Sequence, residues 1–437
     1  MRNGRLWRAL LGVEQTVVER VELDETAGEP TVVAHVRPVA GQRSRCGLCR
    51  RHCPRYDVGA GRRRWRSLDL GTVQVLVEAA APRVRCPDHG VVVAAVPWAR
   101  HGAGHTHGFD DQVAWLAVRC SKSAVRTLMR IAWRTVGTIV TRVAADAQAG
   151  HDHLAGLRRI GIDEISYKKG HRYLTVVVDQ DSRRLVWAAP GKDSATLFRF
   201  FDALGPDRCA QITHVSSDAA RWIALAVAER CPNALRCADP FHVVAWATDA
   251  LDEVRRQAWR DAYALARTEP RRGRGRPPAG APARPGHANT RRIRYARYAL
   301  WKNPENLTAT QRDKLTWVAK TDPRLYRAYL LKEGLRHVFK VKGDDGKQAL
   351  DRWLSWAARC RIPSFVAVAR TVRAHRPAID ATLDHNLSNA LIESTNTKIR
   401  LLTRLAFGFH SPQALVALAM LSLGGYCPPL PGRTITP

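Results

Sequence analysis

The stretch of residues 160–178 constrains the fold more than any other part of the sequence. A short apolar run, Ile160–Ile162, ends on two acids, Asp163 and Glu164, and a second apolar run follows a basic turn that contains Gly170. Two apolar runs joined by such a turn predict a β-hairpin. A strand that is buried has no structural reason to end on a carboxylate, so we expect Asp163 to serve chemistry rather than packing.

The charge of the chain predicts a polyanionic partner. The 437 residues include 70 Lys+Arg against 39 Asp+Glu, a net charge of +31, which exceeds what solubility requires. No apolar run is long enough to span a membrane and no signal region opens the chain, so we expect no membrane partner and a cytoplasmic, nucleoid-associated protein. Most of the ten cysteines are scattered, as in proteins of a reducing compartment.

Four of the cysteines lie close together between residues 46 and 86. Cys46 and Cys49 form a Cys-x-x-Cys knuckle, and Cys86 and His89 form a Cys-x-x-His knuckle. Two knuckles separated by strand-like sequence predict a zinc ribbon with one structural Zn²⁺. Cys53 competes with His89 as the fourth ligand, and a set of unligated thiols is the alternative to zinc.

An arginine-rich strand lies between the two knuckles. Its residues are Arg62, Arg63, Arg64, Trp65 and Arg66. Arginines interleaved with an aromatic residue can hold phosphates and stack on bases, which would place these residues on DNA. The same pattern also fits a strand with one core tryptophan and solvated arginines, and the sequence does not decide between the two.

Three short amphipathic segments between residues 109 and 146 predict a helix-turn-helix. The third segment would be the recognition helix, with Val136, Ile139, Val140 and Val143 on its buried face. Arg134, Thr138 and Arg142 are the residues we expect it to offer to DNA. Generic bundle helices are the alternative.

Further acids lie at the ends of later predicted strands. Asp218 follows one β-rich run, and Asp239 follows another, with His242 three residues on. Strands that alternate with helices predict an α/β sheet, and such sheets place functional groups at strand ends. Far downstream, Glu393 lies on a predicted helix.

Two aspartates at strand ends and a helical glutamate are the ligands that a two-metal phosphoryl-transfer site requires. Carboxylate oxygens suit Mg²⁺ or Mn²⁺, and two ions about 4 Å apart would assist the attacking and the leaving oxygen. The alternative is three unrelated surface acids. On the same helix, Asn396, Lys398 and Arg400 are candidates for DNA contacts.

Several segments together resemble the bacterial insertion-sequence transposases of the ISL-three family. They are "IGIDEISYKKGHRYLTVVVD", "VSSD", "ADPFHVV", "WKNPENLT" and "NALIESTNTKIRLLTRLAFGFHS". The resemblance implies a ribonuclease H-like catalytic domain in which Asp163, Asp218 and Glu393 form the acidic triad. It also implies that Asp239 and His242 line the same site.

The expected architecture is multidomain α/β. An N-terminal β region with the zinc ribbon (1–100) and the helix-turn-helix (101–150) precede a mixed α/β catalytic domain. The catalytic domain comprises residues 151–250 and a C-terminal helical part, 387–437, and a largely helical insertion domain (251–386) interrupts it. The insertion would begin with a basic disordered loop (267–292), where "RGRP" places Arg274 and Arg276 as in the core of an AT-hook; a plain linker is the alternative.

The function expected from these features is that of a DNA transposase. It would bind the terminal inverted repeats of an insertion sequence, as a homodimer on double-stranded DNA. It would then catalyse Mg²⁺-dependent 3′-end cleavage and strand transfer to target DNA. A zinc-ribbon and helix-turn-helix regulator, or a structure-specific nuclease without strand transfer, are the alternatives.

Overall fold

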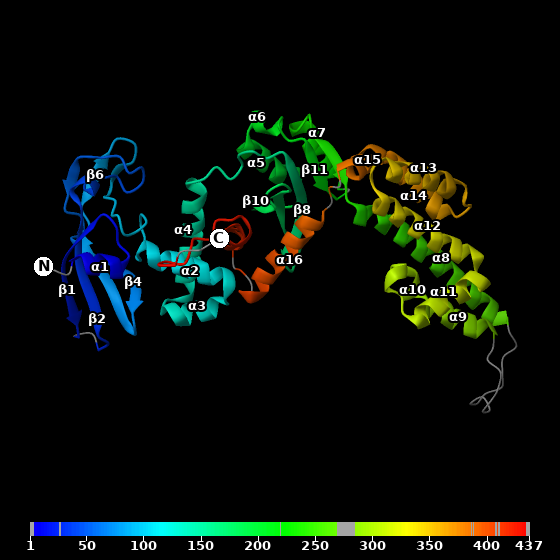
Figure 1. The fold of residues 1–437 in the computed structure, drawn as a ribbon, viewed down its shortest axis with the longest axis horizontal. Coiled ribbons are helices and arrows are strands. Elements are labelled where there is room, and N and C mark those ends of the chain that lie inside the picture. Colours follow the sequence, from blue (N-terminus) through cyan, green and yellow to red (C-terminus); the bar gives the residue numbers. More distant parts are fainter. Residues whose placement is uncertain are drawn as a thin grey trace, which may run out of the picture. The chain divides into compact units, whose positions relative to one another are not determined.

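The computed structural model describes residues 4–25, 28–218, 220–268, 285–385, 387, 389–406, 409 and 411–433. It divides the chain into two compact units. The first comprises residues 1–153, 184–189 and 397–437, and the second comprises residues 154–183 and 190–396. Figure 1 labels some of the elements of each. No helix in the described ranges has both the length and the apolar composition needed to cross a membrane.

The first unit begins with a four-stranded sheet of order β1-β2-β5-β4. Its elements are α1 (Gly4–Leu11), β1 (Thr16–Asp24), β2 (Thr31–Pro38), β4 (Arg62–Leu70) and β5 (Val73–Ala80). Trp65 of β4 is 2% exposed and lies edge-on to Trp98, with 5.5 Å between the ring centroids. The core of this sheet therefore depends on a pair of buried indole rings.

A three-stranded sheet carries the cysteine-rich region. Its order is β3-β6-β7, and the elements are η1 (Ala40–Gln42), β3 (Arg55–Asp57), β6 (Arg83–Cys86) and β7 (Gly90–Val93). Cys46, Cys53, Val84, Cys86 and Ala94 form its small buried cluster. So few apolar side chains bury little surface, which is why such subdomains commonly rely on a metal.

The helix-turn-helix consists of α2 (His107–Arg119), α3 (Lys122–Met129) and α4 (Trp133–Ala149). Thr106 and Ser121 cap the first two helices through their side-chain oxygens, and Arg130 takes a left-handed conformation (φ 51°) in the tight turn before α4. The predicted apolar face of α4 is buried as expected. Helix α17 (Pro412–Leu423) packs against α4 and α2, and it is grouped with them in the first unit.

The second unit contains four strands of a mixed sheet of order β10-β9-β8-β11-β12, and residues 184–189 of β10 are grouped with the first unit. The strands are β8 (Arg159–Lys168), β9 (Arg172–Asp179), β10 (Arg184–Pro190), β11 (His214–Ser217) and β12 (Leu235–Ala238). Strands β8 and β9 form the predicted hairpin, with Gly170 at a positive φ in its turn, whereas β8, β11 and β12 run parallel. Helices α5 (Ser194–Leu204), α6 (Pro206–Cys209) and α7 (Arg221–Arg230) connect these strands, which gives the expected mixed α/β arrangement.

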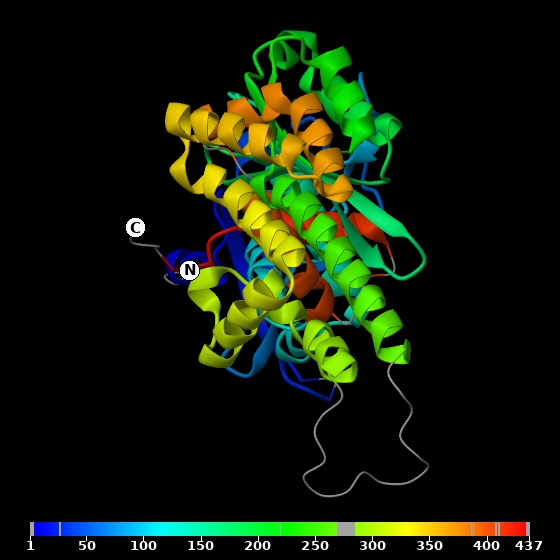
Figure 2. The same cartoon turned by 90° about the vertical axis from the view of Figure 1, so that its right-hand side faces the viewer.

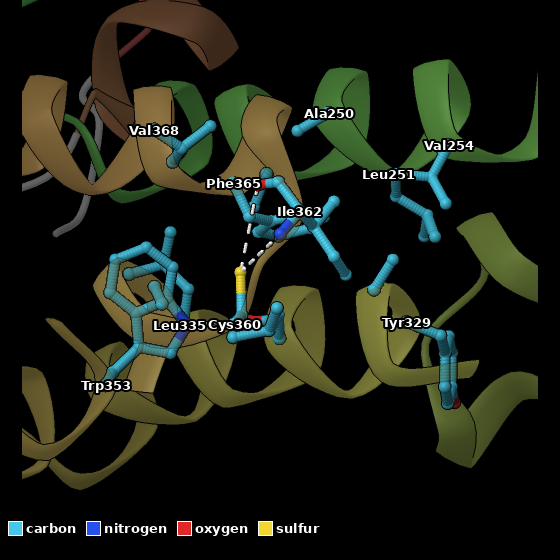
Figure 3. Packing of buried hydrophobic residues seen from close by; sticks show 14 of the residues in the cluster. Ala250, Leu251, Val254, Tyr329, Leu335, Trp353, Cys360, Ile362, Phe365 and Val368 are labelled. Atoms are coloured by element: carbon cyan, nitrogen blue, oxygen red, sulfur yellow. Dashed lines mark hydrogen bonds between the residues drawn. The ribbon is translucent and has the colours of Figure 1, made fainter. Parts of the chain in front are cut away.

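A helical bundle follows β12. Its elements are α8 (Pro240–Thr268), α9 (Pro285–Tyr295), α10 (Arg297–Trp301), η2 (Pro304–Asn306), α11 (Ala309–Thr321), α12 (Pro323–Val341), α13 (Gly343–Arg359), α14 (Pro363–Ala374) and α15 (Arg376–His385). Figure 2 shows α8 and α12 side by side, and Figure 3 shows Leu251, Trp353 and Phe365 in the apolar interior that these helices share. The next helix, α16 (Ala390–Leu405), returns to the sheet.

Two expected boundaries in this region are wrong. The boundary near residue 251 falls inside α8, because that helix runs for 29 residues without a glycine or an internal proline. The expected loop 267–292 is also too long, since α8 extends to Thr268 and α9 begins at Pro285. Arg274 and Arg276 lie outside the described residues.

Candidate active site

Three aspartates align across the parallel strands of the second unit. Ser217 of β11 pairs with Ile162 of β8 on one side and with Ala238 of β12 on the other. The residues that follow this row are Asp163, Asp218 and Asp239. Because the strands are parallel and in register, the three residues lie along one edge of the sheet.

Asp218 and Asp239 follow the last residues of their strands, as predicted, but Asp163 does not. Strand β8 continues to Lys168 and pairs with β9 throughout, whereas its parallel neighbour β11 ends opposite Ile162. Asp163 therefore lies where the adjacent strand ends. The sequence alone indicates where a strand's apolar run stops, and the hairpin partner extends the strand beyond that point.

Asp163 is held from two directions. Its Oδ1 accepts the backbone N–H of Glu164 at 2.8 Å, and its Oδ2 accepts the amide of Asn396 at 2.8 Å. Burial raises the pKa of Asp163 to about 6, and the nearby carboxylates of Glu164 and Asp218 act in the same direction. A carboxylate that is costly to ionise in isolation gains from a bound cation.

Glu164 is a member of this acidic cluster that the sequence reasoning missed. Ligand oxygens of Asp163, Glu164 and Asp218 lie within 4.8 Å of one another. Strand alternation predicts that the side chain of Glu164 points to the opposite face from that of Asp163, but the rule fixes only the Cβ direction. Two adjacent acids at this place in the strand were the only signal in the sequence.

The cluster suits a hard divalent cation. All of its donors are carboxylate oxygens, and Oε2 of Glu164 is buried and has no hydrogen-bond partner among the residues that the structure describes. Lys192 forms an ion pair with Oε1 of the same glutamate. The side chain of Glu164 is only 9% exposed, so its charge is costly without a counter-charge.

Asp239 and His242 form a hydrogen-bonded pair at the third strand. Nδ1 of His242 donates to Oδ2 of Asp239 at 2.8 Å, and the backbone N–H of Asn389 donates to Oδ1 at 3.2 Å. Burial pushes the pKa of Asp239 up, but the hydrogen bonds from His242 and Asn389 outweigh it and hold that pKa below its usual value. The same pair raises the pKa of His242.

Helix α16 begins by crossing the edge that carries the aspartates. Asn389 bonds to Asp239, which follows β12, and Asn396 bonds to Asp163 of β8. The seven residue steps from Asn389 to Asn396 therefore cover the distance between these two strands. A helical rise of 1.5 Å per residue gives about 10 Å for seven residues, and two strand spacings also amount to about 10 Å. Glu393 lies between the two asparagines along the chain, but it is exposed and lies outside the three-acid cluster.

Asn396 is 3% exposed and bonded to Asp163, so it supports the acids and is not available as the DNA contact we predicted. Lys398 and Arg400 are exposed on α16, as a DNA-contacting role requires.

The four predicted zinc ligands come together in the first unit. Ligand atoms of Cys46, Cys49, Cys86 and His89 lie within 4.8 Å of one another. The sulfurs of Cys49 and Cys86 are 3.7 Å apart, and Nδ1 of His89 is 3.5 Å from the sulfur of Cys86 and 3.8 Å from that of Cys46. Tetrahedral zinc, with Zn–S of about 2.3 Å and Zn–N of about 2.0 Å, would set these separations at about 3.8 and 3.5 Å.

The side chains of the arginine-rich strand bind mainly to other residues of the protein. Arg62 and Arg64 both bind Glu78, at 2.6 and 2.8 Å, and keep about half of their side-chain surface exposed. Arg63 donates to the carbonyl of Ala103. Arg66, with a side chain only 11% exposed, pairs with Asp69. Since Trp65 is in the core, the base-stacking interpretation of this strand is wrong for Trp65 and Arg66.

The recognition helix presents only part of its predicted set. Arg134 and Thr138 are exposed on α4. Arg142 instead donates to the fully buried carboxylate of Asp110 at 3.2 Å, which gives it a partner within the protein. Burial raises the pKa of Asp110 to about 6 even though Arg142 and Arg100 are nearby. Because an ionised carboxylate is costly to bury, a charged partner stabilises it there.

Comparison with known proteins matches three successive parts of the chain to family models. Residues 160–419 match a family model described as "Transposase", residues 94–144 match the helix-turn-helix domain of transposase family ISL3, and residues 42–89 match the zinc-finger of transposase IS204/IS1001/IS1096/IS1165. The chain is 69% identical over 436 residues to the transposase for insertion sequence element IS1557 of Mycobacterium tuberculosis, covering 99% of this chain and 98% of the relative. It is 26% identical over 416 residues to the transposase for insertion sequence element IS1001 of Bordetella parapertussis, covering 94% and 96%.

Proposed function

Because this chain belongs to transposase family ISL3, whose DDE-type members cleave and join DNA, we propose that it cuts the 3′ ends of an insertion sequence and transfers them to target DNA. The proposed catalytic acids are Asp163, Asp218 and Glu393, on a ribonuclease H-like sheet. The observation that carries this assignment is the register of β8 and β11, which brings the first two acids together, with α16 laid across the same edge.

The acids would hold two divalent cations, Mg²⁺ or Mn²⁺. Bound there, the ions would activate the attacking oxygen and stabilise the leaving one. The protein supplies a fixed donor set: the sheet holds Asp163 and Asp218, and the amide of Asn396 orients Asp163. Asp239 and His242 do not belong to the three-acid cluster, and we assign them the role of fixing the start of α16 through Asn389.

Recognition of the DNA ends would fall to the N-terminal region. One Zn²⁺ held by Cys46, Cys49, Cys86 and His89 would stabilise the ribbon, and α4 would enter the major groove with Arg134 and Thr138. Lys398 and Arg400 would bind phosphates. Two copies acting on the two ends of the element, as a homodimer, would allow both ends to be processed together.

The test is cleavage of an oligonucleotide that carries the element's own terminal repeat, with and without Mg²⁺. Asp163→Asn, Asp218→Asn and Glu393→Gln keep the side-chain size and should each abolish 3′-end cleavage while repeat binding stays within a few-fold of wild type. Asp181→Asn is the matched control, because Asp181 lies beyond the end of β9 and pairs with Arg159 at the start of β8. Normal cleavage by Asp163→Asn would rule out the proposed site, and cleavage without strand transfer would favour a nuclease.

A further inference from the structure

The turn between β10 and α5 is built to fix the residue that follows Gly191. Gly191 has a φ of +130°, and a Cβ at this position would lie 1.9 Å from Oγ1 of Thr196, so only glycine fits. Its N–H donates to the carbonyl of Tyr173 at 3.0 Å, and its own carbonyl accepts the hydroxyl of Thr175 at 3.0 Å. These bonds to β9 hold the backbone of Lys192 in one place.

The side chain of Lys192 is directed to the acidic cluster. Its ammonium pairs with Oε1 of Glu164 and lies 4.9 Å from the ring centroid of Tyr173. Glu164 is 9% exposed and within 4.8 Å of the ligand oxygens of Asp163 and Asp218, whereas the side chain of Lys192 is 42% exposed. The ammonium of Lys192 therefore lies on the solvent-exposed side of the acids, where a bound DNA strand would pass.

A phosphodiester that approaches this edge meets several carboxylates of its own sign. Metal ions offset part of that repulsion, and a fixed cation can stabilise the charge that the phosphoryl oxygens gain in the transition state. A lysine on a rigid turn, with its ammonium already desolvated on one side by an aromatic ring, requires little reorganisation to do this.

On the basis of the transposase function above, we propose that Lys192 is a further catalytic residue that binds a non-bridging oxygen of the scissile phosphate, and that Glu164 is the positioning residue that holds it there. During 3′-end cleavage, a water oxygen forms a bond to phosphorus as the bond to the 3′ oxygen breaks. The water proton passes to solvent and the 3′ oxygen gains one. Lys192 keeps its protons throughout and acts through charge alone.

The experiment uses the full-length protein, the terminal-repeat oligonucleotide and single-turnover cleavage over a range of Mg²⁺ concentrations. Lys192→Met should slow cleavage on the order of 100-fold, the size of effect expected for the loss of one transition-state contact, with an unchanged Mg²⁺ midpoint and unchanged repeat binding. Lys347→Met is the matched control, because Lys347 also forms an ion pair, with Asp384, in the helical bundle. It should cleave at the wild-type rate.

Glu164→Gln separates positioning from metal ligation. It should slow cleavage about tenfold without moving the Mg²⁺ midpoint, and the double variant Glu164→Gln/Lys192→Met should be no slower than Lys192→Met, because the glutamate acts only through the lysine. A wild-type rate for Lys192→Met, or recovery of activity in the double variant, would overturn the proposal. A raised Mg²⁺ midpoint in Glu164→Gln would make that residue a metal ligand instead. If the wild-type protein itself does not cleave, the proposed function fails rather than this inference.

Discussion

The amide of Asn396 donates to Oδ2 of Asp163 at 2.8 Å, and 233 residues of sequence separate the two. This bond joins the helix that carries Glu393 to the strand that carries the first acid. Both partners are largely buried, so the bond contributes to a fixed geometry rather than to a fluctuating surface contact.

Asn396→Leu should reduce cleavage without unfolding the protein. Leucine is similar in size to asparagine but has no amide, so Asp163 loses the partner that orients it. We expect a decrease of about 10- to 100-fold in the cleavage rate, as for other residues that orient metal ligands. Thr403→Ala, farther along α16, removes only a hydroxyl bonded to its own helix and should have little effect. Equal rates for both variants would show that the orientation of Asp163 does not depend on Asn396.

Metal dependence should change with pH around the pKa of Asp163. Burial raises that pKa to about 6, so the free protein holds a proton there at a pH where an ordinary aspartate has lost it. Metal binding must release this proton, so the Mg²⁺ concentration for half-maximal cleavage should be constant above pH 7 and rise about tenfold per unit below pH 6. Measurement between pH 5 and 8 would test this, and a midpoint that is flat down to pH 5 would contradict it.

Zinc content should distinguish the four clustered ligands from Cys53. Purified protein should contain about one Zn²⁺ per chain, and Cys49→Ser or His89→Gln should lower both the zinc content and the binding of the terminal repeat. Cys53 is buried and donates to the carbonyl of Arg51, so Cys53→Ser should retain the metal. Loss of zinc in Cys53→Ser, with full occupancy in His89→Gln, would exchange the roles of these two residues.

Two arginines of α4 should behave differently when replaced. Arg134→Ala should weaken repeat binding without a change in melting temperature, because Arg134 is exposed. Arg142→Met should destabilise the fold by about 2 kcal/mol, because the buried carboxylate of Asp110 loses a charged partner. Thermal unfolding and a binding titration on the same samples would test both, and a stable Arg142→Met protein that no longer binds DNA would restore Arg142 as a DNA contact.

Local sequence patterns predicted most of the elements that hold the site. The hairpin, the helix-turn-helix and the strands before Asp218 and Asp239 follow from periodicity and turn residues. The position of Asp163 within a longer strand did not, because it depends on the partner strand. Side-chain partners could not be predicted either. The sequence does not reveal that Glu78 binds two arginines or that Arg142 donates to the buried Asp110. Such contacts join residues that only the tertiary fold brings together.

The backbone N–H of Asn389 lies 3.2 Å from Oδ1 of Asp239, so the chain leaves the sheet and returns to it at neighbouring points. Helices α8 to α15 lie between these two points of the chain, and the last of them, α15, packs against β12 next to them. A segment inserted in this way can lengthen, shorten or be exchanged with little strain on the sheet, because the distance that it must close is already short. We therefore expect relatives of this protein to differ most in the size of this bundle. The distances between the acids that precede it in the sequence and Glu393, which follows it, should stay constant.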